Sequence, residues 1–417
     1  MKKSSQKRIL IVSHGHPDIN KGGAEVAAYN LHQELLNQGE DSHFLARTDL
    51  VPHGGAAFST RNNDPREILF HTTMDDNFLF SNIKTRHLWQ EFRDLLLLLK
   101  PDVIHLHHYF LLGIEIFQEI RQTLPNAKIL LTLHEFLAIC HHNGLMIKTN
   151  DKLCYKASSR DCSRCFPKKS PGDFFLREQY IKKMFQQVDV FISPSQFLKD
   201  RYCDWGLDEK RVTVIENGQP EPLSQCLPQN IPDTVAGDER KVRFAYFGQI
   251  NPYKGIDILL KAIDSLPRKI KREVTLDIHG ANLDGQKSDF KDIVEDLLED
   301  VNKQVNFYGS YEAHEMPKLL STVDWAIVPS IWWENSPMVI QEAHNYQIPL
   351  IVSDIGGMAE KVEDNVDGLH FRAGKSASLA EVITRVVTDR SIKDKLKANI
   401  KTPLKISKCA SIHLELY

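Results

Sequence analysis

The chain has 417 residues, of which 26% are charged and 42% hydrophobic, so it is too long for one small module and too ordinary in composition for a fibre or a disordered tail. Because a single core stops growing beyond roughly 250–300 residues, we expect two globular domains. The 52 Lys and Arg residues nearly balance the 55 Asp and Glu residues, and a net charge of −3 gives no global field that would attract nucleic acid or an anionic membrane. We therefore predict no nucleic-acid partner.

The sequence offers no candidate for a membrane-spanning stretch or a secretory leader. Its longest strongly apolar stretch, residues 95–99, is far short of the roughly 20 residues that cross a bilayer. Four apolar residues follow the first lysines, fewer than the roughly 7–15 of a signal peptide. Seven cysteines, an odd number, do not suit a secreted disulfide scaffold. These features predict a cytoplasmic protein.

Short apolar runs of strand type recur along the chain, and most are followed by stretches with helical spacing. They are residues 9–13, 103–106, 129–133, 190–193 and 212–215 in the first half, and 242–247, 276–279, 305–308, 325–328 and 350–353 in the second. Continuous apolar runs are typical of parallel strands that are covered on both faces. The pattern therefore predicts an α/β fold.

A proline-rich stretch, Pro220–Asp238, separates the two series of runs and shows almost no periodic pattern. We predict a first doubly wound domain over residues 1–215, a linker over 216–239 and a second doubly wound domain over 240–395, with the two domains facing each other across a cleft. Ligands of open α/β sheets bind at the carboxyl ends of strands, so the residues just after each strand are the candidates for function.

Gly22 and Gly23 come after the first predicted strand and before a stretch of helical spacing. Paired glycines at a helix N-terminus let backbone amides approach a phosphate or sugar oxygen, and the helix dipole favours negative charge there. The alternative is a tight turn that needs glycine for its dihedral angles.

His134 directly follows the run 129–133, which places an imidazole at the carboxyl end of a strand. Such a side chain can donate a hydrogen bond to a substrate or phosphate oxygen, and its charge is tunable near neutral pH. The chain has 18 histidines, and plain packing is the alternative for each of them. His105, His107 and His108 illustrate it, because alternate residues of one strand point the same way and can simply pack.

Lys254 lies in the loop Phe247–Gly255, which follows a predicted strand and precedes a helical apolar face. A lysine beside glycines at a helix N-terminus can clamp a diphosphate, since it adds a point charge where amides already converge. A solvated loop lysine is the alternative.

Two carboxylates, Glu334 and Glu342, are separated by seven residues in the segment 328–343. If a helix starts near Ser336 or Pro337, Glu334 lies in the loop before it and Glu342 inside it. Both acids can then reach one ligand and accept hydrogen bonds from the vicinal hydroxyls of a ribose or hexose. The apolar residues 338–340 indicate a buried helix rather than a solvated one.

These segments resemble a known family. The spacing from Glu334 to Glu342 is similar to that of retaining glycosyltransferases with the GT-B fold, closest to glycosyltransferase family 4, the group 1 glycosyltransferases. The resemblance covers nearly the whole chain, through Gly22–Glu25, Asn217-Gly218, Phe247–Gly255, Ser353–Glu360 and Asp367–Phe371. It implies two Rossmann-like domains, and a C-terminal segment, residues 396–417, that crosses back to the first domain.

The resemblance also implies roles for individual residues. Glu334 would contact the hydroxyls of the donor sugar, Glu342 the nucleotide ribose and Lys254 the donor diphosphate. His134 would orient the donor sugar and stabilise the transition state. The remaining donor-binding residues would be Gly22, Gly23, Gln249, Asn335 and Ser336. Gln249 departs from the family, which often has Arg there, so Lys254 and backbone amides would carry more of the diphosphate binding.

The implied reaction transfers a hexose from a UDP- or GDP-linked sugar to a saccharide or lipid-linked saccharide, with retention, in cell-surface polysaccharide biosynthesis. The enzyme would clamp the leaving diphosphate without an obligatory nucleophile and without a required cofactor. The chain contains no Asp-x-Asp motif, which favours GT-B over the metal-dependent GT-A enzymes. A nucleotide-sugar epimerase of the same fold and a non-catalytic partner in polysaccharide assembly are the alternatives.

Four cysteines crowd into a predicted insertion over residues 140–170. Cys140, Cys154, Cys162 and Cys165 have the spacing C-x13-C-x7-C-x2-C. In a reducing compartment four such thiols suggest a structural zinc ion, with His141 or His142 able to replace one of them. Reduced cysteines that bind nothing are the alternative.

An amphipathic stretch follows this insertion. Its apolar stripe comprises Phe174, Phe175, Ile181, Met184, Phe185 and Val188, and we place Arg177, Lys182 and Lys183 outside the stripe. A helix that faces the core is the preferred interpretation. Peripheral association with the inner face of a membrane is the alternative.

Overall fold

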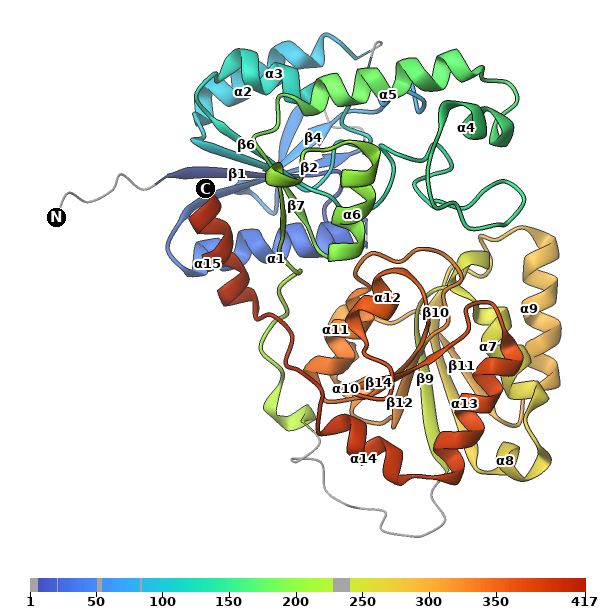
Figure 1. The fold of residues 1–417 in the computed structure, drawn as a ribbon. Helices are drawn as coiled ribbons and strands as arrows, with labels where there is room; N and C mark the ends of the chain where they lie inside the picture. Colours follow the sequence, from blue (N-terminus) through green and yellow to red (C-terminus); the bar gives the residue numbers. More distant parts are fainter. Residues whose placement is uncertain (1–6, 21, 51–54, 83–84, 228–240) are drawn as a thin grey trace. The chain divides into compact units, whose positions relative to one another are not determined.

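A computed structural model describes residues 7–20, 22–50, 55–82, 85–227 and 241–417 of the chain (Figure 1). It divides into two compact units. The first comprises Met1–Gly218 together with Leu404–Tyr417, and the second comprises Gln219–Pro403. In the described residues no helix has the length and hydropathy needed to cross a membrane.

The first unit is built on an eight-stranded sheet with the order β3-β4-β2-β1-β5-β6-β7-β8. The strands β4, β2, β1, β5, β6, β7 and β8 pair in parallel, and β3 is antiparallel to β4. Their bounds are β1 Arg8–Ser13, β2 Asp41–Thr48, β3 Phe58–Arg61, β4 Asp64–His71, β5 Val103–Leu106, β6 Lys128–Thr132, β7 Val190–Ser193 and β8 Val212–Val214.

Both faces of this sheet are covered by helices. Burial shows this, since four consecutive residues of β1, Ile9 to Val12, are all fully buried although their side chains alternate between the two faces. The helices are α1 Gly23–Asn37, α2 Leu88–Leu99, α3 Ile116–Thr123, α4 Ser159–Cys165, α5 Pro171–Phe185, α6 Gln196–Trp205 and α15 Ile406–Leu416. Figure 1 shows α15, the last helix of the chain, beside α1, where Cys409 and Ala410 join the core.

The second unit has a six-stranded parallel sheet with the order β11-β10-β9-β12-β13-β14. The strands are β9 Val242–Gln249, β10 Val274–Ala281, β11 Val305–Gly309, β12 Trp325–Val328, β13 Leu350–Ser353 and β14 Gly368–Phe371. The helices are α7 Ile256–Ser265, α8 Arg268–Arg272, α9 Ser288–Asp300, α10 Met316–Leu320, α11 Met338–Asn345, α12 Gly356–Lys361, α13 Ser376–Thr388 and α14 Ser391–Lys397.

The predicted α/β class, with two doubly wound units, is confirmed. Each apolar run that was predicted as a strand is one, with ends that differ by a few residues. The strands β2, β3, β4 and β14 were not predicted. Their sequences mix polar and apolar residues, and β3 and β4 form an antiparallel pair at the edge of the sheet, where continuous apolar runs are not required.

The structure divides the chain at different residues from those expected. The first unit continues to Gly218, and the segment 396–417 is shared, since residues 404–417 belong to the first unit and residues up to 403 to the second. Of the predicted linker 216–239, residues 228–239 lie outside the described residues. The facing arrangement of the two domains across a cleft stays a prediction.

The amphipathic stretch forms α5, but the predicted positions of two residues are wrong: Arg177 was placed outside the buried stripe and Phe175 within it. Arg177 is buried, with an exposed fraction of 3%, whereas Phe175 is 54% exposed. Arg177 shares the buried face with Phe174 and Ile181, at helical spacing, and donates hydrogen bonds to the carbonyl groups of Phe78, Leu137 and Ala138. These three acceptors take one hydrogen bond from each nitrogen of the guanidinium group and help it to lie inside the protein.

Candidate active site

In the second unit the candidate residues lie at the point where the strand order reverses. From β9 the chain continues outward through β10 and β11 on one side, and β12 then begins on the other side of β9. The carboxyl ends of two such neighbouring strands form the usual ligand site of an open α/β sheet. Lys254 follows β9, and Glu334 follows β12.

The two loops are in close contact. The backbone N–H of Ile331 donates to the carbonyl of Tyr253 at 2.9 Å. Gly255 has a φ of +70°, and a Cβ atom there would lie 2.0 Å from the carbonyl oxygen of Pro329. Asn251 caps the turn, because its side-chain oxygen accepts from the amides of Tyr253 and Lys254. The glycine is therefore required both by its dihedral angle and by the approach of the second loop.

Glu334 is buried, with an exposed fraction of 7%, and its Oε1 atom accepts three hydrogen bonds. The Lys254 ammonium donates at 2.6 Å, the Ser330 hydroxyl at 2.8 Å and the Trp332 indole at 2.9 Å. Lys254 also lies 5.4 Å from the centroid of the Trp332 ring. These contacts hold one carboxylate and one ammonium group at the end of the sheet.

Two glycines hold the backbone of Glu334 and Asn335. The amide of Gly357 donates to the carbonyl of Glu334 at 2.6 Å. A Cβ atom on Gly357 would lie 1.8 Å from the carbonyl oxygen of Asn335, and Gly356 has a φ of +60°. The start of α12 therefore packs directly on the loop that carries Glu334.

Glu342 lies inside α11, one turn after its start, and the loop with Glu334 precedes this helix, as predicted. Burial raises the pKa of Glu342 to about 7. Burial also raises the pKa of Tyr311, and the nearby Glu342 charge adds to that shift. A carboxyl group with this pKa exists in both protonation states near neutral pH.

Gln249 is the exposed last residue of β9, and Asn335 and Ser336 lie in the loop before α11. The Ser336 hydroxyl is buried and has no hydrogen-bond partner among the described residues. It is a donor and acceptor that a bound molecule could satisfy.

The first unit has a corresponding point between β1 and β5. From β1 the chain continues to β2 on one side, and β5 begins on the other side of β1. Gly22 is the N-cap of α1, the helix after β1, and Gly23 is its first residue. A Cβ atom on Gly22 would lie 2.3 Å from Oε2 of Glu25, so the missing side chain leaves room for this carboxylate.

Glu25 is buried and lies close to His14, with 3.1 Å between Glu25 Oε1 and His14 Nε2. Burial raises the pKa of Glu25 and lowers that of His14 to about 4, an effect to which Arg47 also contributes. The structure thus places a carboxyl group and an imidazole beside the glycines that the sequence indicated.

His134 follows β6 and contacts His107, which follows β5. His134 Nε2 and His107 Nδ1 are 3.1 Å apart, and the two rings are stacked with their centroids 5.3 Å apart. Burial lowers the pKa of His134 to about 3, with His14 as a second cause. His134 is therefore neutral at pH 7, and its ring can donate at one nitrogen while it accepts at the other.

A further histidine connects this pair to Tyr417, the C-cap residue of α15. His105, on β5, is fully buried and its ring lies 4.5 Å from that of His107. Its two nitrogens are 2.7 Å from the hydroxyls of Tyr417 and Thr132. Packing alone was the alternative for these histidines, and the structure shows that they are also hydrogen bonded.

Several of these contacts were not predicted from the sequence. Ser330 and Trp332 hold Glu334, His107 holds His134, and Glu25 fills the space at Gly22. Ser330, Trp332 and Glu25 stand next to the motifs already noted, so proximity in sequence was an available signal. The contact of His107 with His134 could be found only by knowing that β5 and β6 are neighbours in the sheet.

Two family models match the chain, and together they account for most of it. The model described as Glycosyltransferase Family 4 matches residues 21–219, and the one described as Glycosyl transferases group 1 matches residues 229–402. With the doubly wound fold, they define the class as a GT-B protein. The chain belongs to the group 1 glycosyltransferases and is family 4-like.

Among curated proteins, the chain is similar to the lipopolysaccharide 1,2-N-acetylglucosaminetransferase of Salmonella typhimurium. The two are 29% identical over 204 residues, which are 48% of this chain and 53% of that protein. The chain spans about half to two thirds of the first three curated relatives that it matches, 53%, 67% and 54% of their lengths.

Among solved structures, the fold is similar to that of sucrose-phosphate synthase from Thermosynechococcus elongatus, with a TM-score of 0.71, 18% identity and coverage of 99% of this chain and 98% of that one. It is also similar to Anabaena HepE in complex with UDP-glucose, with a TM-score of 0.66, 17% identity and coverage of 99% and 100%. Both similarities support the GT-B fold class.

Proposed function

We propose that the chain is a retaining glycosyltransferase that transfers a hexose from a UDP- or GDP-linked sugar to a saccharide or lipid-linked saccharide. The observation that carries this proposal is the pairing of Lys254 with Glu334 at the carboxyl ends of β9 and β12. An ammonium group and an acceptor carboxylate side by side suit a ligand that joins a diphosphate to a polyhydroxylated ring.

Glu334 is the proposed acceptor for the hydroxyl groups of the donor sugar. The donors from Lys254, Ser330 and Trp332 converge on Oε1, so Oε2 is the oxygen that a sugar hydroxyl would approach. Lys254 would bind the leaving diphosphate and stabilise the negative charge that develops there as the glycosidic bond breaks. Gln249, exposed at the end of β9, would add a hydrogen bond without charge.

Glu342 would accept hydrogen bonds from the nucleotide ribose, and Asn335 and Ser336 would complete the donor site. The buried Ser336 hydroxyl, which has no partner among the described residues, supports this assignment. Hydrogen bonds donated by the ribose would favour the ionised form of Glu342. Because its pKa in the empty site is about 7, this shift would occur near neutral pH.

His134 would act on the sugar as a neutral imidazole, which orients a hydroxyl group and stabilises the transition state through a hydrogen bond. Its depressed pKa and its contact with His107 both support a fixed, uncharged ring. Gly22 and Gly23, at the start of α1, would offer backbone amides to the diphosphate. The acceptor hydroxyl would attack the donor sugar on the face from which the diphosphate leaves and would pass its proton to the departing diphosphate, with no enzymic nucleophile.

A role in cell-surface polysaccharide biosynthesis is supported by the similarity to the Salmonella lipopolysaccharide transferase. Association with a membrane that carries a lipid-linked acceptor would use α5. Phe175 and Leu176 are 54% and 63% exposed on that helix. Lys168 and Lys169 precede them and could contact anionic headgroups.

A nucleotide panel tests the donor proposal. Thermal unfolding is measured with UDP, GDP and ADP and with their common sugars, and release of nucleotide is measured with saccharide acceptors. We expect one nucleotide to raise the melting temperature and Glu342→Ala to abolish that rise. The proposal is wrong if no nucleotide sugar loses its nucleotide with any acceptor and Glu342→Ala leaves the stabilisation unchanged. Conversion of the sugar without an acceptor would instead identify an epimerase.

A further inference from the structure

The segment between β6 and α5 contains a long stretch that the hydrophobic core does not hold. Residues 148–170, all of which the structure describes, include no buried side chain, and α4 within this stretch has none either. Its regular structure is limited to α4 and an isolated bridge between Ile147 and Leu153. Chain segments that cannot bury apolar surface commonly depend on a disulfide or a metal ion.

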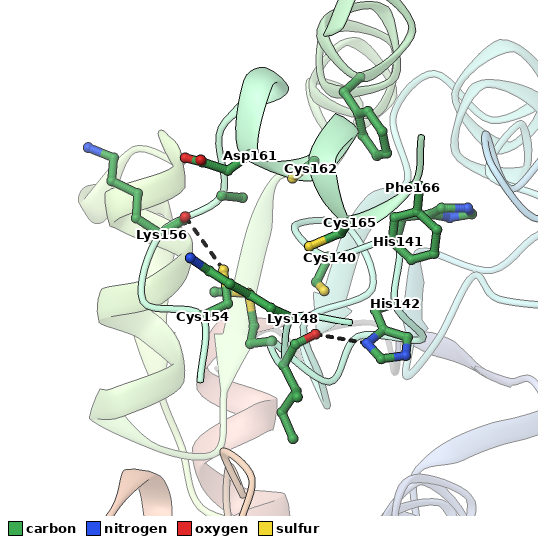
Figure 2. Close-up of a pocket in the computed structure, with 14 residues that line it drawn as sticks. Cys140, His141, His142, Lys148, Cys154, Lys156, Asp161, Cys162, Cys165 and Phe166 are labelled. Carbon is green, nitrogen blue, oxygen red and sulfur yellow. Dashed lines mark hydrogen bonds between the residues drawn. The ribbon is translucent and has the colours of Figure 1, made fainter. Parts of the chain in front are cut away.

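Four of the seven cysteines surround one small pocket in this segment. Figure 2 shows Cys140, Cys154, Cys162 and Cys165 around it, and the pocket is lined by these four but not by Cys203, Cys226 or Cys409. None of the seven cysteines forms a disulfide. The cavity volume is about 20 Å³, on a scale where one water needs roughly 10–15 Å³. The space therefore suits a single ion and is too small for a sugar.

Backbone hydrogen bonds set the positions of the four cysteines. The amide of Cys140 donates to the carbonyl of Phe136 at 2.8 Å, and that of Cys154 donates to the carbonyl of Met146 at 2.7 Å. Cys162 and Cys165 are three residues apart on α4, so both lie on one side of the helix. The four cysteines that line the pocket therefore come from two loop positions, Cys140 and Cys154, and from one side of α4.

The thiol groups themselves are not arranged around a shared point. Within the described residues no group of three or more His, Cys, Asp or Glu side chains could hold a metal ion as it stands. The Cys154 thiol, for example, donates to the carbonyl of Lys156 at 3.5 Å. Rotation of a cysteine between staggered rotamers redirects its sulfur atom without a change in the backbone.

We propose that Cys140, Cys154, Cys162 and Cys165 bind one structural Zn²⁺ ion as four thiolates. Zinc favours four sulfur ligands in a tetrahedron at about 2.3 Å in such sites. Each thiol loses its proton to solvent as its Zn–S bond forms, and no group is oxidised or reduced. Two of the ligands come from a CxxC pair on α4, and the other two come from the ends of the loop 140–154.

This ion would hold the loop that follows His134. Arg177 already fixes the carbonyl groups of Leu137 and Ala138 from α5, on one side of that loop. A metal ion bound by Cys140 would fix its other end. This positioning role rests on the proposed function of His134, whereas metal binding itself does not depend on it.

Metal binding is tested on the full-length protein, purified under reducing conditions and stripped with a chelator. We expect one equivalent of Zn²⁺ per chain to bind again, and one equivalent of Co²⁺ to give the thiolate charge-transfer and strong d–d absorption of a tetrahedral site. Cys162→Ser and Cys165→Ser should lose both signals, and Cys203→Ser, which changes a thiol outside the pocket, should keep them. Absence of the cobalt bands, equal binding by Cys165→Ser, or a disulfide among the four cysteines would overturn the proposal.

Limited proteolysis tests the structural role without any variant. Removal of the ion from the wild-type protein should expose residues 148–170 to cleavage at least tenfold faster, and added Zn²⁺ should restore resistance. Unchanged cleavage rates would show that the ion does not hold the segment. Nucleotide-induced stabilisation, measured in parallel, reports on the second unit, so failure of the metal proposal and failure of the proposed function give different results.

Discussion

The Lys254 ammonium lies 2.6 Å from the Glu334 carboxylate, although the two residues are 80 positions apart in the chain. Each follows one of two neighbouring parallel strands, β9 and β12, and the loops that carry them are joined by the hydrogen bond from Ile331 to Tyr253. The pair is partly screened from water, with the side chains 28% and 9% exposed.

Lys254→Met keeps most of the side-chain volume and removes the charge. Because a hydrogen bond to a charged group contributes about 1.5–3 kcal/mol, we expect the free energy of unfolding to fall by roughly that amount, as measured by urea denaturation. Loss of a charge that stabilises the leaving group should lower kcat about 100-fold or more. Lys261→Met is the matched control, since Lys261 pairs with Asp257 at 2.9 Å on the surface of α7. It should cost less than about 1 kcal/mol, and equal losses in the two variants would contradict the prediction.

Gly357→Ala should destabilise the second unit by displacing the loop with Glu334. The added methyl group would meet the carbonyl of Asn335, a backbone atom that cannot move away as a flexible side chain would. We expect a loss of about 1–3 kcal/mol or more in the free energy of unfolding, together with weaker nucleotide binding. Gly172→Ala is the control, because Gly172 lies in the first turn of α5 and its added Cβ would have only an ordinary contact at 3.5 Å. Nucleotide affinity equal to wild type in Gly357→Ala would show that the loop does not shape the site.

The candidate residues near β9 and β12 could be predicted from the sequence because each stands in a local pattern, whereas the contact between Lys254 and Glu334 joins loops 80 positions apart and was not predicted. Continuous apolar runs mark the buried parallel strands, and Lys254, Glu334 and Glu342 stand directly after a strand or inside the helix that follows. Trp325–Val328 is one run whose predicted and observed bounds coincide. Position relative to a strand end is therefore enough to indicate the candidate residues in this sheet.

The contacts of Arg177 and His107 could not be predicted in the same way, because they depend on segments that are distant in sequence. The helical pattern of α5 places Arg177 on the buried face, but a charged residue is buried only when acceptors are available. Here they come from residues 78, 137 and 138. The pairing of His107 with His134 likewise requires β5 and β6 to be neighbours, which the sequence pattern does not reveal.

His107→Phe should keep the ring stack with His134 and remove the hydrogen bond to its Nε2 atom. A net hydrogen bond of about 0.5–1.5 kcal/mol corresponds to a decrease in kcat of up to about tenfold, with KM for the nucleotide sugar nearly unchanged. The effect should disappear in a His134→Ala background, because the two side chains act as a unit. His314→Phe, an exposed histidine of the second unit, serves as the control. Additive losses in the double variant would show that His107 acts independently of His134.

Glu342 should make the stability of the unliganded protein depend on pH. Burial raises its pKa from 4.5 to about 7, so between these values the folded protein keeps a proton that the unfolded chain has released. The unfolded state binds fewer protons in this window, and the free energy of unfolding therefore falls as the pH rises from about 4.5 to 7 and levels off above it. At about 1.4 kcal/mol per pKa unit, the residue contributes a decrease of about 3 kcal/mol.

Glu342→Gln removes the titrating group and should flatten the pH dependence by that amount. Urea denaturation of wild type and variant between pH 4.5 and 8 measures the difference, which should grow with pH up to about 7 and then stay constant. Glu299→Gln, on the exposed side of α9, is the matched control for loss of one carboxylate. A saturating nucleotide that binds the ionised Glu342 through its ribose should reduce the wild-type slope, since binding then favours release of the proton that the empty site retains. Parallel stability curves for wild type and Glu342→Gln would show that burial does not perturb this carboxyl group.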